Sequence, residues 1–188
     1  SNFIFIPVGG LANRMKAVAS SFILAQQNQI KTNVIWFQDW ALHAPFNTVF
    51  EPIHSPNICI KEASLIDHII YDRPRAKNLY IPRFIFRSCL YEKTIQDLKK
   101  QNFNFNNWIQ KGHVYMASYL DFQEISTDIL RQLFIPLPPI QARIDHLSQQ
   151  FSPYTLGVHV RRTDNAASIE LSPIELFFTA IDKEIDSY

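Results

Sequence analysis

The sequence predicts an α/β fold built on a parallel sheet, and three features of its first 37 residues predict it. Residues 3–8 form a short, almost uninterrupted apolar run, which is typical of a strand buried on both faces of a parallel sheet. Gly9 and Gly10 end this run, and apolar residues then recur at helical spacing over residues 11–27. Residues 33–37 form a second apolar strand. Together they make a βαβ unit with a right-handed connection, which predicts a Rossmann-like sheet.

The middle of the chain carries weaker signals. The apolar pattern there predicts further strands at residues 57–61 and 113–118, and helices at residues 91–100 and 126–133. Ser126 is a suitable N-cap for the second of these helices. Residues 72–87 mix proline, arginine and aromatic residues without a clear period, so we predict a loop or an insertion there.

The order of these signals divides the chain into three parts. Residues 1–135 make the N-terminal α/β domain, and residues 136–153 make a linker region with a helix from Pro139 to Gln150. Residues 154–188 begin a second domain with a strand at 154–160 and a helix that Ser172 caps before Pro173. Because one strand and one helix cannot bury both faces of a sheet, we expect this second domain to be incomplete in the chain.

Composition excludes several classes of function. A net charge of +1 gives no reason to expect nucleic acid as a partner. No apolar run reaches the roughly 18–20 residues of a membrane span, and the first apolar run is unlike a signal peptide, so we expect a cytoplasmic protein. Cys59 and Cys89 are expected to be reduced thiols. The histidines show no metal-ligand spacing, so we assign no metal.

The first candidate binding site is the turn between the first strand and the first helix. Gly9 and Gly10 allow a ligand to approach the backbone closely, and the helix N-terminus that follows favours a phosphate. Asn13 and Arg14 add side-chain donors within the first helical turn. The alternative is a simple tight turn with Arg14 in solvent. The third glycine of a dinucleotide fingerprint is absent, since Arg14 stands in its place.

The second candidate site lies at the end of the strand predicted at residues 154–160. His159 and Arg161 are two residues apart and therefore share one face of that strand, while Arg162 and Asp164 follow its end. An arginine at a buried strand end needs an anionic ligand or an acidic neighbour, and its planar fork suits phosphate oxygens. The alternative is a structural ion pair of an arginine with Asp164 beside a core histidine.

These residues carry a resemblance to a known family. The run Gly157-Val-His-Val-Arg-Arg-Thr-Asp164 resembles the HxRRxD motif of GDP-fucose-dependent fucosyltransferases, and it is most similar to the α1,6 type. The run Gly9-Gly-Leu-Ala-Asn-Arg14 is similar to the turn that opens the first domain of α1,2 and related members. Together the two motifs cover about 14 residues, and the middle of the chain matches no motif of the family.

The resemblance implies a two-domain fold of the GT-B kind and an inverting transfer of fucose from GDP-fucose to a glycan acceptor, with no cofactor and no metal. It implies that Arg161 contacts the donor diphosphate and that Arg162 supports it. His159 and Asp164 would contact the donor or orient the arginines, and Asn13 would reach the donor from the N-terminal side. A general base is also needed. Glu170 is the nearest glutamate after the motif, although its spacing departs from the family, and a solvated Glu170 is the alternative.

Other interpretations remain open at this stage. Asp39 follows the second strand and could serve as the ribose ligand of a nicotinamide-binding unit, but it lies further along than the roughly 20 residues expected. A nucleotide- or sugar-binding module without catalysis is the main alternative function. The basic and aromatic residues 73–87 could line an acceptor site or form a solvated loop. Phe177, Phe178 and Ile181 mark a helix face that we expect to be exposed or buried against another copy.

Overall fold

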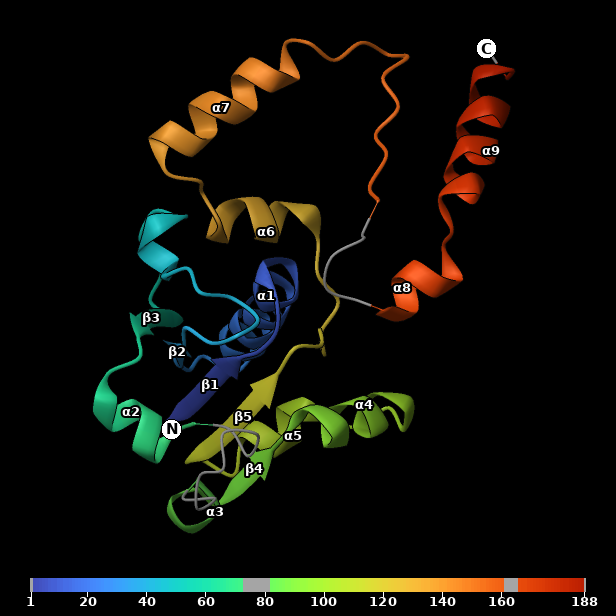
Figure 1. Cartoon of the computed structure of the whole chain (residues 1–188). Coiled ribbons are helices and arrows are strands. Elements are labelled where there is room, and N and C mark those ends of the chain that lie inside the picture. The colour runs from blue at the N-terminus through green and yellow to red at the C-terminus, as the bar shows by residue number, and fades with distance from the viewer. Residues whose placement is uncertain (1, 73–81, 161–165, 188) are drawn as a thin grey trace. The chain divides into compact units, whose positions relative to one another are not determined.

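The computed structural model describes residues 2–72, 82–160 and 166–187 (Figure 1). It divides the chain into two compact units, Ser1–Ala142 and Arg143–Tyr188. The strands are β1 (Phe3–Pro7), β2 (Thr32–Trp36), β3 (Ile58–Glu62), β4 (Ser88–Leu90) and β5 (Val114–Ser118). The α-helices are α1 (Leu11–Gln27), α2 (Leu65–Ile70), α3 (Pro82–Ile85), α4 (Glu92–Lys100), α5 (Phe105–Ile109), α6 (Thr127–Leu133), α7 (Pro138–Ser148), α8 (Ala166–Leu171) and α9 (Ile174–Ile185), and η1 (Phe46–Thr48) is a 3-10 turn.

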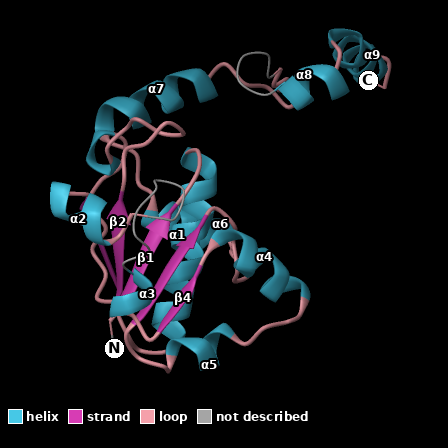
Figure 2. Ribbon diagram, turned by 60° about the horizontal axis from the view of Figure 1, so that its bottom comes forward, coloured by secondary structure: helices cyan, strands magenta, loops and turns pink. Residues whose placement is uncertain are grey.

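The described strands form one parallel sheet in the order β3-β2-β1-β5-β4, with helices on its faces, so the α/β prediction is confirmed (Figures 1 and 2). The central strands β1 and β5 are buried along their whole length. Burial on both faces explains why their sequences are continuously apolar instead of alternating.

Two apolar clusters lie on the two faces of this sheet. Phe3 and Phe5 of β1 point into the larger cluster, which also holds residues of α1, α4, α5 and α6. Ile4 and Ile6 point into the smaller cluster with Phe86 and Tyr115. Helix α1, between β1 and β2, and helices α4 and α5, between β4 and β5, contribute to the larger cluster, whereas Tyr71 and Phe86, between β3 and β4, belong to the smaller one. This arrangement is expected when every crossover has the same hand.

Several local signals predicted the elements of the first unit closely. Helix α1 spans the residues that the apolar spacing predicts, and the Ser126 side chain caps α6 by accepting a hydrogen bond from the Ile129 N–H at 3.3 Å. The prediction of a loop over residues 72–87 is wrong for Pro82–Ile85, which form one helical turn, while residues 73–81 lie outside the described residues. Strand β4 was missed because three edge residues are too few to show a period.

The second unit differs more from expectation. Residues 154–160 form no strand, and Tyr154 is 75% exposed, so the predicted strand there is wrong. An apolar run needs a partner strand for its backbone hydrogen bonds, and these residues pair with none of the described strands. Helix α9 begins at Ile174 with Pro173 as its N-cap residue, so the prediction of Ser172 as the cap is also wrong. Its apolar side chains are exposed in part, with Phe178 at 58%.

Candidate functional site

The turn after β1 lies at the carboxyl edge of the sheet, the edge at which open α/β sheets bind ligands. The Val8 N–H donates to the Ser118 carbonyl at 2.9 Å, which carries the pairing of β1 and β5 up to the turn. Gly9 then adopts a φ of +86°, in the left-handed region that glycine accepts without strain. A Cβ atom at Gly9 would stand 3.3 Å from Nδ2 of Asn13 and 3.5 Å from Cβ of Tyr119. The turn therefore requires glycine at position 9.

Gly10 has a different role in the same turn. Its backbone is extended, with a φ of −70°, and a Cβ atom there would meet nothing within 4 Å. It is the N-cap residue of α1, so no side chain caps this helix, and the first turn of the helix holds no acidic residue. Among the described residues no acceptor is bonded to the N–H groups of Leu11, Ala12 or Asn13, so a ligand or solvent can meet them, and the helix dipole favours an anion at this position. Asn13, one turn along, is exposed beside them.

Arg14 is fully buried beneath the turn. Its Nε donates to the Gly9 carbonyl at 2.7 Å, its Nη1 donates to the Phe37 carbonyl, and its Nη2 donates to Oδ1 of Asp39 at 3.0 Å. The guanidinium carbon also lies 5.0 Å from the centre of the Trp36 ring. The interpretation of Arg14 as a solvated residue is therefore wrong. The cation links the loop after β1 to the loop after β2, and its known contacts are with protein groups.

The Asp39 carboxylate accepts hydrogen bonds from backbone groups as well as from Arg14. Its Oδ1 also accepts hydrogen bonds from the backbone N–H groups of Ala41 and Leu42, at 2.9 and 3.2 Å. The Asp39 side chain keeps only 18% of its surface exposed. These contacts make Asp39 the organiser of the loop after β2.

The residues predicted further along the chain are described only in part. Arg161, Arg162 and Asp164 lie outside the described residues. His159 is exposed, so its interpretation as a core histidine is wrong, and Glu170 is exposed on α8. Both belong to the second unit, whereas Gly9, Gly10, Asn13 and Arg14 belong to the first.

Sequence reasoning missed two partners of the turn, Tyr119 and Phe37. Both follow strands of the parallel sheet, since Tyr119 comes directly after β5 and Phe37 directly after β2. The rule that the carboxyl ends of parallel strands share one edge could have found them once β5 was recognised as a neighbour of β1.

No three side chains among the described histidines, cysteines, aspartates and glutamates are grouped to hold a metal ion. None of the described helices combines the length and the apolar character needed to span a bilayer. Comparison with known proteins matched no protein-family model, no curated protein and no solved structure.

Proposed function

We propose that the protein is a glycosyltransferase of the fucosyltransferase type, which transfers a sugar from a nucleotide sugar, GDP-fucose, to a hydroxyl group of a glycan. The observation that carries the proposal is the glycine turn at the carboxyl edge of the parallel sheet, where α1 begins without a capping side chain. Such an edge suits the phosphates of a nucleotide, because its backbone N–H groups are directed at the ligand and its dipole favours negative charge.

In this proposal the two glycines and Asn13 face the donor. Gly9 lets the backbone turn tightly enough for Asn13 to lie over it, and Gly10 leaves the surface of the turn open. The exposed Asn13 amide can donate to a phosphate or a sugar hydroxyl. Arg14 acts from behind by holding the Gly9 carbonyl, so its effect on the donor passes through the shape of the turn.

The motif at residues 157–164 supplies the charge for the reaction. When the bond between the sugar and the diphosphate breaks, negative charge grows on the leaving GDP, and a fixed guanidinium stabilises it. The resemblance assigns this role to Arg161, with Arg162, His159 and Asp164 in support. The choice of guanine as the base and fucose as the sugar also rests on the resemblance. The transfer it implies is inverting and uses no metal.

The acceptor hydroxyl must lose a proton as it attacks the sugar, and a carboxylate is a suitable base. We assign that role to Glu170. The exposure of Glu170 favours a second candidate function, a nucleotide-sugar-binding module without catalysis. Glu170 is exposed on α8, whereas a general base acts best where water is excluded.

Titration calorimetry of the full-length protein with GDP, GDP-fucose and UDP tests the proposal. We expect GDP-fucose and GDP to bind and UDP to bind far more weakly. Release of GDP from GDP-fucose in the presence of a glycan mixture, with a fucosylated product found by mass spectrometry, supports the transferase. Binding without any product over long incubation supports the module, and equal or absent binding of all three nucleotides contradicts both.

A further inference from the structure

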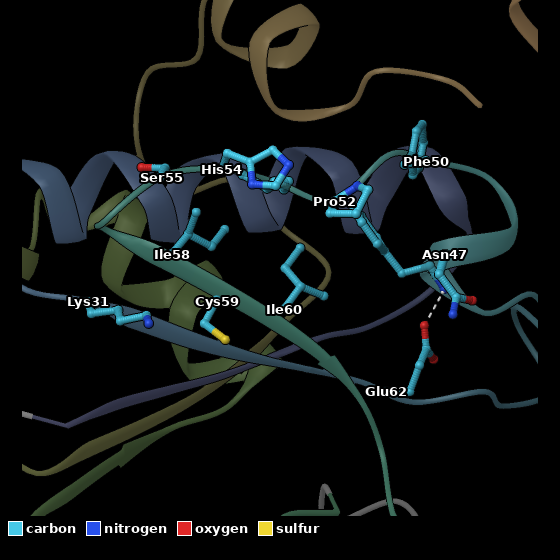
Figure 3. Close-up of a pocket in the computed structure, with 12 residues that line it drawn as sticks. Lys31, Asn47, Phe50, Pro52, His54, Ser55, Ile58, Cys59, Ile60 and Glu62 are labelled. Atoms are coloured by element: carbon cyan, nitrogen blue, oxygen red, sulfur yellow. Dashed lines mark hydrogen bonds between the residues drawn. The ribbon is translucent and has the colours of Figure 1, made fainter. Parts of the chain in front are cut away.

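A groove runs along the outer edge of β3, the outermost strand on that side of the sheet, and it is separate from the turn after β1. Its volume is about 570 Å³, within the usual range of ligand sites. Residues 46–55 form one wall and β3 forms the other (Figure 3).

The hydrogen bonds of β3 fix which of its residues face the groove. The Asn57 carbonyl accepts from the Thr32 N–H, and the Ala63 N–H donates to the Trp36 carbonyl, so the odd-numbered residues use their backbone groups toward β2. The backbone groups of Ile60 and Glu62 therefore point away from the sheet, where no described strand pairs with them. The backbone groups of Ile58 point the same way, but Ile58 is buried. The edge of the sheet is therefore open at Ile60 and Glu62.

The side chains at this edge create an apolar wall. Ile60 packs against the larger core cluster, to which the buried rings of Phe46 and Phe50 belong. In an antiparallel pair, residues directly opposite each other direct their side chains to the same face of the sheet. A residue opposite Ile60 would consequently direct its side chain toward this wall, while its two neighbours would direct theirs to the other face.

The two ends of the groove differ in charge. Lys31 and His54 lie near the end where β3 begins, and Glu62 lies at the other end (Figure 3). Oε1 of Glu62 accepts the Phe46 N–H at 2.6 Å, but its buried Oε2 accepts no hydrogen bond within the described residues. A ligand with an acidic end and a basic end would match this polarity.

We propose that this groove binds an extended peptide segment of a partner protein, which pairs antiparallel to β3. In this direction an acidic residue at the C-terminal end of the segment lies toward Lys31, and a basic residue at its N-terminal end lies toward Glu62. Backbone pairing with Ile60 supplies affinity, and an apolar side chain opposite Ile60 supplies specificity, which is how strand addition to a sheet edge works. Five residues of such a segment span about 13 Å, the length of β3, and the edge is open to backbone pairing at Ile60 and Glu62.

The test uses the 188-residue chain and a fluorescent peptide, acetyl-Lys-Thr-Val-Thr-Glu-amide, labelled beside its N-terminal lysine and followed by anisotropy. The central valine is placed opposite Ile60. N-methylation of this valine removes the N–H that faces β3 and should weaken binding at least about tenfold. N-methylation of the next threonine, whose N–H faces away, is the matched control and should leave binding within about twofold.

Substitutions in the protein test the same contacts without a change in the peptide. Ile60→Pro removes the outward N–H, which an edge strand tolerates, together with part of the apolar wall, and should weaken binding about tenfold, whereas Ile60→Val keeps the N–H and should not. Lys31→Glu should weaken binding about threefold and favour a peptide that ends in lysine, while Lys93→Glu on α4 should change neither. Circular dichroism verifies folding, and the two N-methylated peptides provide the test on unaltered protein.

Three results would overturn the proposal. The first is that the peptide does not bind at millimolar concentration. The second is that the two N-methylated peptides bind equally well. The third is that Lys31→Glu does not change the preference between peptides that end in glutamate and in lysine. A concentration-dependent dimer that Ile60→Pro abolishes, without peptide binding, would assign the edge to a second copy of the chain and would equally overturn it. None of these results depends on whether the protein is a glycosyltransferase.

Discussion

Arg14 and Asp39 form a buried ion pair, with Nη2 and Oδ1 3.0 Å apart, across 25 residues of sequence. The pair connects the first turn of α1 to the loop after β2, and the same guanidinium holds the carbonyl of Gly9. The candidate site thus has a support beneath it. The backbone conformation of the turn depends on the buried Arg14 guanidinium, which does not need to contact a ligand.

Replacement of this support should destabilise the fold. Arg14→Met keeps most of the side-chain volume but leaves Asp39 and two carbonyls without their donor, and we expect a loss of about 3 kcal/mol in the free energy of unfolding. Urea unfolding measures it. Lys16→Met, an exposed position on the same helix, is the control and should change the free energy by less than about 0.5 kcal/mol. Equal stability of the two variants would contradict a structural role for Arg14.

The two glycines of the turn should respond differently to the same substitution. Gly9→Ala forces a side chain into a φ of +86° and toward Asn13, so we expect about 1–2 kcal/mol of destabilisation. Gly10→Ala meets nothing within 4 Å and has an ordinary φ, so it should cost little. Thermal unfolding of both variants makes the comparison. A larger loss for Gly10→Ala would show that the turn has a different conformation.

Stability should depend on acid through Asp67. Burial acts to raise the pKa of this carboxyl, but hydrogen bonds from Lys61, at 2.8 and 2.9 Å, and from Ser64 outweigh it and hold the pKa below its ordinary value of 3.8. A lowered pKa in the folded state means that the carboxylate stabilises the fold above about pH 4, and this contribution is lost as the pH falls through the folded-state pKa.

Asp67→Asn should therefore be less stable than the parent protein at pH 7, and the difference between the two should shrink toward about pH 2.5. Urea unfolding over this pH range measures it, with Asp97→Asn on the exposed surface of α4 as the control. A difference that stays constant with pH would show that the carboxylate charge is not what stabilises the start of α2.

The arginines of the motif should have unequal roles in transfer. If Arg161 stabilises the leaving diphosphate, Arg161→Ala should lower kcat by at least about two orders of magnitude. Arg161→Lys should also be poor because an ammonium cannot reproduce the bidentate fork, and Arg162→Ala should lose less. Steady-state kinetics of sugar transfer by the protein and its variants compares them. Near-normal turnover for Arg161→Ala would leave the motif as a structural ion pair.

The framework of the first unit could be predicted because its signals are local. The glycine break and the apolar period predicted α1 to the residue, and continuous apolar runs predicted β1 and β5 because both are buried on two faces. Strand β4 has three residues, and the short helix α3 lies in a stretch with no period. Elements of that size depend on their neighbours for stability, so their own residues carry little signal.

The position of the turn after β1 was predictable, but the role of its arginine was not. The break in the apolar pattern at Gly9 and Gly10 placed this turn at the carboxyl edge of the sheet. The burial of Arg14 depends on Asp39 and on the carbonyl of Phe37, and no local pattern joins residues so far apart. The strand predicted at residues 154–160 failed for a related reason, since an apolar run makes a strand only where a partner strand meets it.

The central proposal is that the protein binds a nucleotide sugar and that Asn13 and Arg161 both contribute to its affinity. Calorimetric titration of GDP-fucose into the full-length protein and its Asn13→Ala and Arg161→Ala variants tests it, with Lys93→Ala as the control. We expect a loss of affinity of about tenfold for Asn13→Ala and about thirtyfold or more for Arg161→Ala, and no change for the control. Unchanged affinity in both variants, or no binding of GDP-fucose by the parent protein, would contradict the claim.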